Sequence, residues 1–455
     1  MNLMERGLRL YVGVIRVFFK LNKKNNQNNN ELQPIKKMKR VTLFLAICLS
    51  LSIKAQDIQR LFENRDFISL YNLGVGDWES DDFSSSLIKA STFHAMFRPE
   101  KSNREIEFLL TTSEAKESPG WRIHLLIWQA DNYVRTFQYR RAAEIYEKIL
   151  INYGDLLGEG KWSFQNIVQK YYALSDVKPL QVNIPHDNIQ IQMTPDKKGL
   201  PQVSVRTPKD SVSLIFDTGA GVSSVTRSVA DRLGIRVLAD SIIIGGSTGN
   251  FEYMSIGVAD TLFLGNVLFT NVVFGIFEDE KFTFPEYDYM VNGTLGFPEI
   301  KALSSMKIHR NDVLEVVKNT EYQHRSNMML TENREIFVQV NDSLLFFLDT
   351  GAVWSSLSVN YYNEHREHIE KTGEFTTRVV GGMGGSREFP VYRLTDFPIQ
   401  IGENSVILPT ISVFIQAIFQ RHEFDGVLGQ DVISQFDYML LDFRNMHFSL
   451  GNTNN

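Results

Sequence analysis

Phe216-Asp217-Thr218-Gly219-Ala220 and Leu348-Asp349-Thr350-Gly351-Ala352 are two copies of one short phrase, each at the end of an apolar run. Two variable residues after each copy lead to a pair of serines, Ser223-Ser224 and Ser355-Ser356. A single Asp-Thr-Gly carries little information, because Asp and Gly are ordinary turn residues. Two copies in matching surroundings indicate a duplicated unit.

The residues that follow each copy strengthen this interpretation. Gly293-Thr294-Leu295-Gly296-Phe297 follows the first copy, and Gly426-Val427-Leu428-Gly429-Gln430 follows the second. The distance from the Asp to the second Gly is 296 − 217 = 79 residues in the first copy and 429 − 349 = 80 in the second. Ten residues further on, both copies carry Met, at Met306 and Met439. The spacing predicts two lobes related by a pseudo-two-fold axis, each giving one carboxylate to a shared cleft.

A pair of carboxylates at such a point has defined chemistry. Two carboxylates about 3 Å apart cannot both ionise, so the pair would hold one proton. The ionised member can activate a water, and the protonated member can give its proton to a carbonyl oxygen or a leaving amine. Water is then the nucleophile, and neither a cofactor nor a metal is expected. Gly219 and Gly351 would let the backbone turn tightly, and the hydroxyls of Thr218 and Thr350 suit cross-lobe hydrogen bonds.

These two phrases, with Leu295-Gly296 and Leu428-Gly429, resemble the aspartic protease superfamily, and its retropepsin-like branch more than pepsin itself. The resemblance covers roughly residues 180 to 452. It implies a mainly β, bilobal fold with closed β-barrel lobes. It also implies that Asp217 and Asp349 form the catalytic dyad, with Thr218 and Thr350 as interlocking hydroxyls.

The match to the retroviral enzymes is incomplete at one position of each copy. In both copies an Ala follows the Gly, at Ala220 and Ala352, and this is similar to the retroviral enzymes. Gly221 and Val353, however, stand where they often carry another Asp. Contacts made by that Asp are therefore not expected in this chain.

A glycine cluster follows each phrase. The first begins with Gly245 and Gly246, and the second with Gly381 and Gly382, at 245 − 217 = 28 and 381 − 349 = 32 residues from the Asp. Glycine lowers local stability, as mobile lids require, so both clusters are interpreted as flap tips like those that close over a peptide in this family. A pair of ordinary surface turns is the alternative. Tyr253 is a further candidate for substrate contact.

Composition limits the other classes of function. The formal net charge is −6, and no basic stripe beyond the N-terminus points to nucleic acid as a partner. Cys48 is the only cysteine, so no intramolecular disulfide can form. A single helix is expected over 359–369. His365 and His368 lie at i and i+3 on it, a spacing that can ligate a metal, but the zinc-protease pattern is absent, so no metal site is expected.

The N-terminus resembles an export signal. Met38-Lys39-Arg40 precedes the apolar run 41–53, which is too short to span a bilayer but fits a signal-peptide core with cleavage near Ala55-Gln56. The mature chain would then have no integral membrane span and would be periplasmic or secreted. We expect Met38 to be the start of translation and residues 1–37 to be a misread extension.

Between the leader and the first lobe, residues 56–177 have helical character. Ala130, Tyr133, Ala142 and Tyr146 fall at the small and aromatic positions of a tetratricopeptide repeat, with a break near Phe137. The resemblance is partial, so a plain helical packing domain remains an equal alternative. One hypothesis is that this segment shields the cleft.

The predicted organisation has four parts, which are the extension and signal peptide (1–55), the helical domain (56–177), the first lobe (178–318) and the second lobe (319–455). The predicted function is an exported aspartic endopeptidase that acts on a peptide or protein substrate. Because both half-sites lie in one chain, we expect a monomer. The alternative is a peptide- or protein-binding module that has kept the fold.

Overall fold

The structure of the chain is a computed structural model that describes residues 57–78, 82–185, 189–245, 251–317, 325–382, 385–417 and 424–452. Contacts divide the chain into two compact units, Met1–Asn64 and Arg65–Asn455, and the second unit is treated below. The predicted leader, with Cys48, lies outside the described residues, and so does Gly246. Within the described part of the chain, no helix is both long and apolar enough to cross a membrane.

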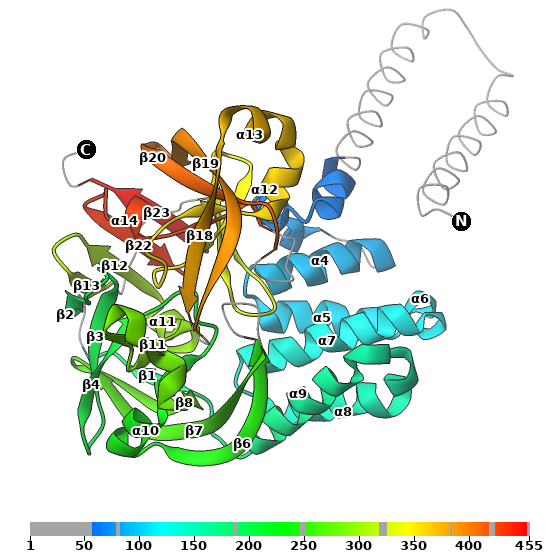
Figure 1. The fold of residues 1–455 in the computed structure, drawn as a ribbon. Helices are drawn as coiled ribbons and strands as arrows, with labels where there is room; N and C mark the ends of the chain where they lie inside the picture. Colours follow the sequence, from blue (N-terminus) through cyan, green and yellow to red (C-terminus); the bar gives the residue numbers. More distant parts are fainter. Residues whose placement is uncertain are drawn as a thin grey trace, which may run out of the picture. The chain divides into compact units, whose positions relative to one another are not determined.

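The N-terminal part of the second unit is helical (Figure 1). Its α-helices are α3 (Phe67–Asn72), α4 (Phe83–Ala95), α5 (Pro99–Leu109), α6 (Ser113–Glu117), α7 (Pro119–Arg135), α8 (Tyr139–Tyr153) and α9 (Lys161–Ala173). Ser118 caps α7 by accepting a hydrogen bond of 3.4 Å from the amide of Trp121. Phe137 has φ of 59° and lies in the turn between α7 and α8. The break between the two helices is therefore where the sequence predicted it. We refer to Phe67–Ala173 as the helical domain.

The first lobe, in the residues that the structure describes, is a β-barrel with two short α-helices. Its strands are β1 (Gln181–Asn183), β2 (Ile189–Pro195), β3 (Pro201–Arg206), β4 (Ser211–Phe216), β5 (Ser223–Thr226), β6 (Arg236–Gly245), β7 (Phe251–Leu264), β8 (Val267–Phe277), β9 (Thr283–Phe284), β10 (Tyr289–Met290), β11 (Gly293–Leu295), β12 (Ser305–His309) and β13 (Val313–Val316), and its helices are α10 (Arg227–Leu233) and α11 (Phe297–Ala302). Strands β3, β4, β11, β5, β8 and β7 are neighbours in this order, and an additional β3–β7 pairing closes the ring.

The second lobe repeats this arrangement. Its strands are β14 (Met328–Leu330), β15 (Ile336–Val340), β16 (Leu344–Leu348), β17 (Ser356–Leu357), β18 (Glu374–Gly382), β19 (Gly385–Ile401), β20 (Asn404–Phe414), β21 (Gly426–Leu428), β22 (Tyr438–Asp442) and β23 (His447–Gly451), and its helices are α12 (Val359–Glu364), α13 (Arg366–Thr372) and α14 (Gln430–Ile433). The order β15-β16-β21-β17-β20-β19 matches that of the first lobe. The amide of Asn341 bonds to the carbonyl of Gln400 at 2.9 Å and links the β15–β16 turn to β19. The predicted mainly β, bilobal fold with a helical N-terminal part is confirmed.

The two lobes join through one antiparallel sheet. Strand β12 of the first lobe pairs with β22 of the second, with Lys307 opposite Leu440. These two residues are equivalent in the two copies, because 440 − 307 = 133, the same offset as 439 − 306 = 133 for the two methionines. The pseudo-two-fold axis therefore passes through this residue pair.

One predicted element differs from the structure. The sequence predicted a single helix over 359–369, but the chain forms α12 and α13, separated at His365. His365 has φ of −116° and ψ of 20°, outside the helical region, and its ring packs on Tyr361 with the ring centroids 4.3 Å apart. The interruption separates His365 from the helix that carries His368.

Candidate active site

Each acidic phrase leaves a barrel strand at the same point of its lobe. Strand β4 runs parallel to β11, and β16 runs parallel to β21. The amide of Asp217 donates to the carbonyl of Leu295 at 3.0 Å, and the amide of Asp349 donates to the carbonyl of Leu428 at 3.0 Å. The Leu-Gly pairs thus hold the first residue of each acidic turn. Burial of Phe216 and Leu348 in the core fixes where the turns begin.

The threonines join the two phrases symmetrically. The Thr218 hydroxyl donates to the carbonyl of Leu348 at 2.8 Å and accepts from the amide of Thr350 at 3.0 Å. The Thr350 hydroxyl donates to the carbonyl of Phe216 at 2.6 Å and accepts from the amide of Thr218 at 3.0 Å. Both side chains are buried. Four bonds without access to water therefore set the distance between the two acidic loops.

Replacement of Thr218 by Val should loosen this junction. Val keeps the shape of the side chain but leaves the Leu348 carbonyl and the Thr350 amide without their partner, at about 1–3 kcal/mol for each buried group. We expect Thr218→Val to lower the free energy of unfolding by about 2–5 kcal/mol in urea titrations. Thr194→Val, on the exposed face of β2, is the matched control. Equal stability of the two variants would contradict the importance of the junction.

The glycines of the two phrases make room for the acidic side chains. A Cβ on Gly219 would lie 2.6 Å from Oδ1 of Asp349, and a Cβ on Gly351 would lie 2.8 Å from Oδ1 of Asp217. Such distances are far inside van der Waals contact. Each carboxyl group therefore reaches across to the opposite loop, and only glycine fits beneath it.

The two carboxyl groups lie on facing sides of this junction, each against the glycine of the opposite loop, and both residues remain partly accessible. Oδ1 of Asp217 accepts from the amide of Gly219 at 2.8 Å, and Oδ1 of Asp349 accepts from the amide of Gly351 at 2.9 Å. Burial and the negative charge of Asp217 raise the pKa of Asp349 well above its ordinary value. Burial also raises the pKa of Asp217. The arrangement is able to hold one proton between two carboxyl groups.

A serine–carboxylate pair lies behind each acidic loop. Ser223 donates from Oγ to Oε2 of Glu299 and accepts from the amide of Gly296 at 2.8 Å. Ser355 donates to Oδ1 of Asp431 at 2.6 Å and accepts from the amide of Gly429 at 2.9 Å. The offsets 355 − 223 = 132 and 431 − 299 = 132 equal that of the two acidic residues, 349 − 217 = 132. The repeat therefore extends to an acid in each half, which binds the serine that contacts the second Gly.

The glycine clusters lie at the ends of β-hairpins. Gly245 ends β6, which pairs with β7. Gly381 and Gly382 end β18, where Gly382 pairs with Gly385 of β19. Nothing occupies the space within 4 Å of a Cβ built on Gly381, so that glycine is not required by crowding.

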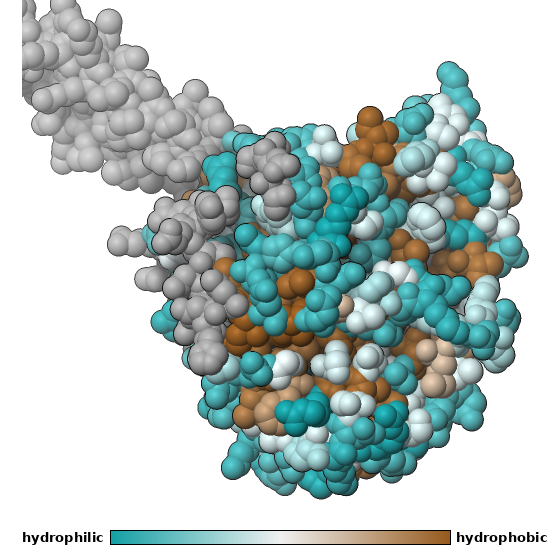
Figure 2. Space-filling view, turned by 90° about the vertical axis from the view of Figure 1, so that its left-hand side faces the viewer, coloured by the Kyte–Doolittle hydropathy of each residue, from teal (hydrophilic) through white to brown (hydrophobic). Residues whose placement is uncertain are grey.

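Exposed apolar side chains accompany these elements. Trp354, five residues after Asp349, is 62% exposed, and Tyr253 on β7 is 67% exposed. Arg378 of β18 donates to the carbonyls of Trp354 and Ser355, both at 3.3 Å, so the second hairpin lies beside the second acidic loop. On the face seen in Figure 2, hydrophobic residues gather in a band between hydrophilic rims.

Several residues of this site were not singled out from the sequence. Glu299 and Asp431 could have been found, because an acid follows each Leu-Gly pair within three residues. Trp354 is aromatic in the second copy only, because Val222 stands at the equivalent position of the first copy. The repeat therefore gave no signal for Trp354. Contacts that the helical domain makes with this region have no local pattern in the sequence.

Comparison with known proteins agrees with this geometry. Residues 203–298 match the sequence model of a family described as aspartyl protease, and this range contains Asp217 and the Leu295-Gly296 pair. A search of curated proteins finds no match. Among solved structures, the chain is similar to basic 7S globulin from soybean, with 11% identity, a TM-score of 0.36, and coverage of 59% of this chain and 95% of that chain. The family match confirms the predicted resemblance to aspartic proteases, and it covers residues 203–298.

Proposed function

We propose that the chain is an aspartic endopeptidase in which Asp217 and Asp349 form the catalytic dyad. The observation that carries this proposal is the meeting of two carboxyl groups, one from each half of a duplicated unit, each of which lies against the glycine of the opposite acidic loop. Their raised pKa values favour retention of one proton by the pair. A structural ion pair would need an opposite charge, whereas two acids side by side suit acid–base chemistry.

The reaction follows from this single proton. The ionised carboxylate takes a proton from a water, whose oxygen attacks the carbonyl carbon of the peptide bond. The protonated carboxyl gives its proton to the carbonyl oxygen and forms a neutral tetrahedral intermediate. Return of that proton to the carboxylate, with transfer of the other proton to the amide nitrogen, breaks the C–N bond. The products are a carboxylic acid and an amine, and the dyad again holds one proton.

The substrate in this proposal is an extended peptide. It would pair its backbone with the glycine-tipped hairpins as an added strand. Exposed Trp354 and Tyr253 supply apolar surface for its side chains. We also propose that the protein is exported through the leader at residues 38–55, on the strength of the basic start and apolar run in the sequence.

A binding module that has lost catalysis is the second candidate, because the family match covers only residues 203–298. A mixed peptide library separates the two. The proposal predicts internal cleavage of peptides that is blocked by a statine-type inhibitor, whose hydroxyl imitates the tetrahedral intermediate. Binding of peptides without any cleavage, from acid to neutral pH, would support the binding module and contradict the proposal.

A further inference from the structure

Helix α9 contacts the first glycine-tipped hairpin through one side chain. Nδ2 of Asn166 donates to the carbonyl of Ile243 at 2.8 Å, and its Oδ1 accepts from the amide of the same residue at 3.0 Å. Strand β6 ends the sheet of the first lobe, so this edge has no neighbouring strand. The carboxamide of Asn166 therefore takes the place of a strand and satisfies both backbone groups of Ile243.

Apolar packing accompanies these two bonds. Ile242 of β6 and Met254 of β7 are buried in one cluster with Tyr146 and Tyr171 of the helical domain. Strand β6 runs beside α9 (Figure 1). This part of the hairpin thus shares one hydrophobic cluster with the helical domain.

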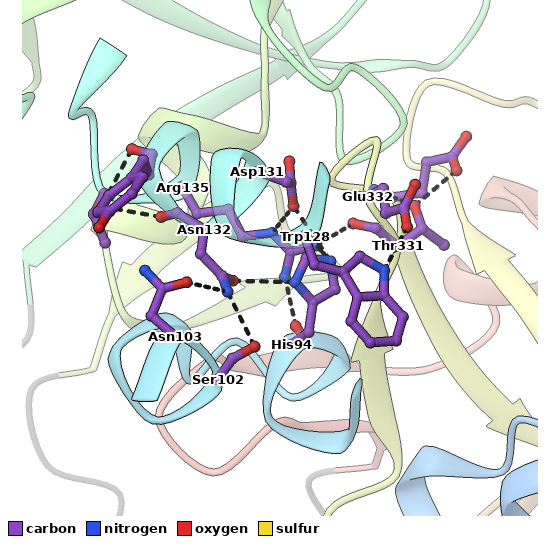
Figure 3. A network of polar contacts seen from close by, with 12 residues as sticks. His94, Ser102, Asn103, Trp128, Asp131, Asn132, Arg135, Thr331 and Glu332 are labelled. Atoms are coloured by element: carbon purple, nitrogen blue, oxygen red, sulfur yellow. Dashed lines mark hydrogen bonds and ion pairs between the residues drawn. The ribbon is translucent and has the colours of Figure 1, made fainter. Parts of the chain in front are cut away.

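The helical domain also reaches the first acidic loop, through residues 331–335 between β14 and β15. Arg135 donates to the carbonyl of Thr331 at 2.7 Å, and Nε1 of Trp128 donates to Oε1 of Glu332 at 2.9 Å (Figure 3). Arg135 is itself buried and held by Asp131 and by the carbonyl of His94, each at 2.5 Å. The loop is therefore fixed by a charged network inside the helical domain.

The other side of this loop lies against the first acidic phrase. A Cβ on Gly221 would lie 2.7 Å from the carbonyl oxygen of Asn333, and Gly221 is 221 − 217 = 4 residues after Asp217. The equivalent Val353 packs instead at the border of the cluster that contains Tyr146 and Tyr171. The helical domain thus approaches the acidic centre along two routes, one through the first hairpin and one through the 331–335 loop of the second lobe.

The second hairpin has a different setting. Strand β18 ends the sheet of the second lobe, and Phe375 and Val379 on it are 59% and 51% exposed. Besides β19, its contacts include Arg378 with the Trp354 loop. Ser386 of β19 donates to Glu286 of the first lobe at 3.2 Å, at an exposed position. Among the described residues, no helix caps the outer edge of β18 as Asn166 caps that of β6.

We propose that Asn166 is a positioning residue for peptide hydrolysis, which holds the first hairpin as a fixed wall for the substrate. The inference rests on the proposed function. It assigns the helical domain a supporting role, in contrast to the hypothesis of a removable shield. Asn166 acts through the backbone of Ile243 and does not touch the acidic pair.

Asn166→Ala in the full chain tests this role, with Gln165→Ala as the matched control, because Gln165 is the exposed neighbour on the same helix. Hydrogen exchange of peptides that contain Ile243 should become about tenfold faster in Asn166→Ala, since two bonds that close this edge are lost. Exchange in 374–382 should not change. KM for a cleaved peptide should rise about five- to tenfold with kcat within about twofold, because loss of a preorganised wall weakens binding more than chemistry.

The outcomes separate the two proposals. If hydrogen exchange at Ile243 in Asn166→Ala equals that in the control, Asn166 does not hold the first hairpin. Faster exchange with KM unchanged would overturn the positioning role and leave only a structural contact. Loss of kcat together with a lower melting temperature would also count against it, because a merely destabilised chain behaves in that way. A wild-type chain that cleaves nothing refutes the proposed function itself, a result that needs no variant.

Discussion

Asn in place of either Asp217 or Asp349 is expected to lower kcat for peptide hydrolysis by about a thousandfold or more, because an amide can neither take a proton from water nor give one to a carbonyl oxygen. The fold should be preserved. An Asn at 217 can still accept the 2.8 Å bond from the amide of Gly219. Since the raised pKa values show that the ionised forms are disfavoured in the folded chain, neither variant should be less stable than the wild type at neutral pH.

Steady-state kinetics with one cleaved peptide and urea titrations measure both parts of this expectation. Asp260→Asn, at an exposed position of β7, controls for the loss of one charge. Either dyad variant with more than a tenth of the wild-type kcat would exclude a shared-proton mechanism. Retained peptide binding by both inactive variants would show that the loss lies in chemistry and not in recognition.

The same pair determines the pH dependence of hydrolysis. Activity needs one proton on the dyad, so the rate falls when the pair takes up a second proton and when it loses the first. Because the pKa of Asp349 lies well above the ordinary 3.8, the alkaline limb of the bell should lie above the range of an isolated aspartate. A flat profile from acid to neutral pH would contradict this assignment.

The local phrases in the sequence were enough to predict the duplicated part of the site. Each Asp-Thr-Gly follows a mainly apolar run, which includes Leu214 in the first copy and Phe346 in the second. The run indicates a strand, the Asp-Thr-Gly indicates a turn, and the second copy indicates the symmetry. The parallel pairing of β4 with β11 places Leu295 opposite Phe216, so that its carbonyl accepts the amide of Asp217. The same local pattern of strand and acidic turn occurs in both copies, which is why it could be predicted from the sequence.

The contacts of the helical domain could not be predicted in this way. Asn166 meets Ile243 across 77 residues, and Arg135 meets Thr331 across 196. Neither pair belongs to a repeat, and an Asn on a helix has the same local pattern whether it faces water or a strand edge. The helix break at His365 was missed for a related reason, since tertiary packing there outweighs a continuous helical pattern.

Glu299→Gln is expected to change how stability depends on pH. Burial raises the pKa of Glu299 from 4.5 to about 7, against the opposing effect of the Ser223 hydrogen bond. The neutral acid is thus favoured in the folded chain. Its contribution to stability is full below pH 4.5 and is lost as the pH rises through about 7. Above that range the folded chain must carry a buried carboxylate, at a cost on the order of 3 kcal/mol.

A Gln at 299 stays neutral at every pH and can still accept the Ser223 hydroxyl. The variant should therefore match the wild type near pH 4.5 and exceed its free energy of unfolding at pH 8 by about 3 kcal/mol. Urea titrations at both values measure the difference, with Glu280→Gln at an exposed position as the control. Asp431, whose pKa burial also raises, will leave some pH dependence in the variant. If Glu299→Gln shifts stability equally at the two pH values, the acid behind the first loop is not held neutral by its surroundings.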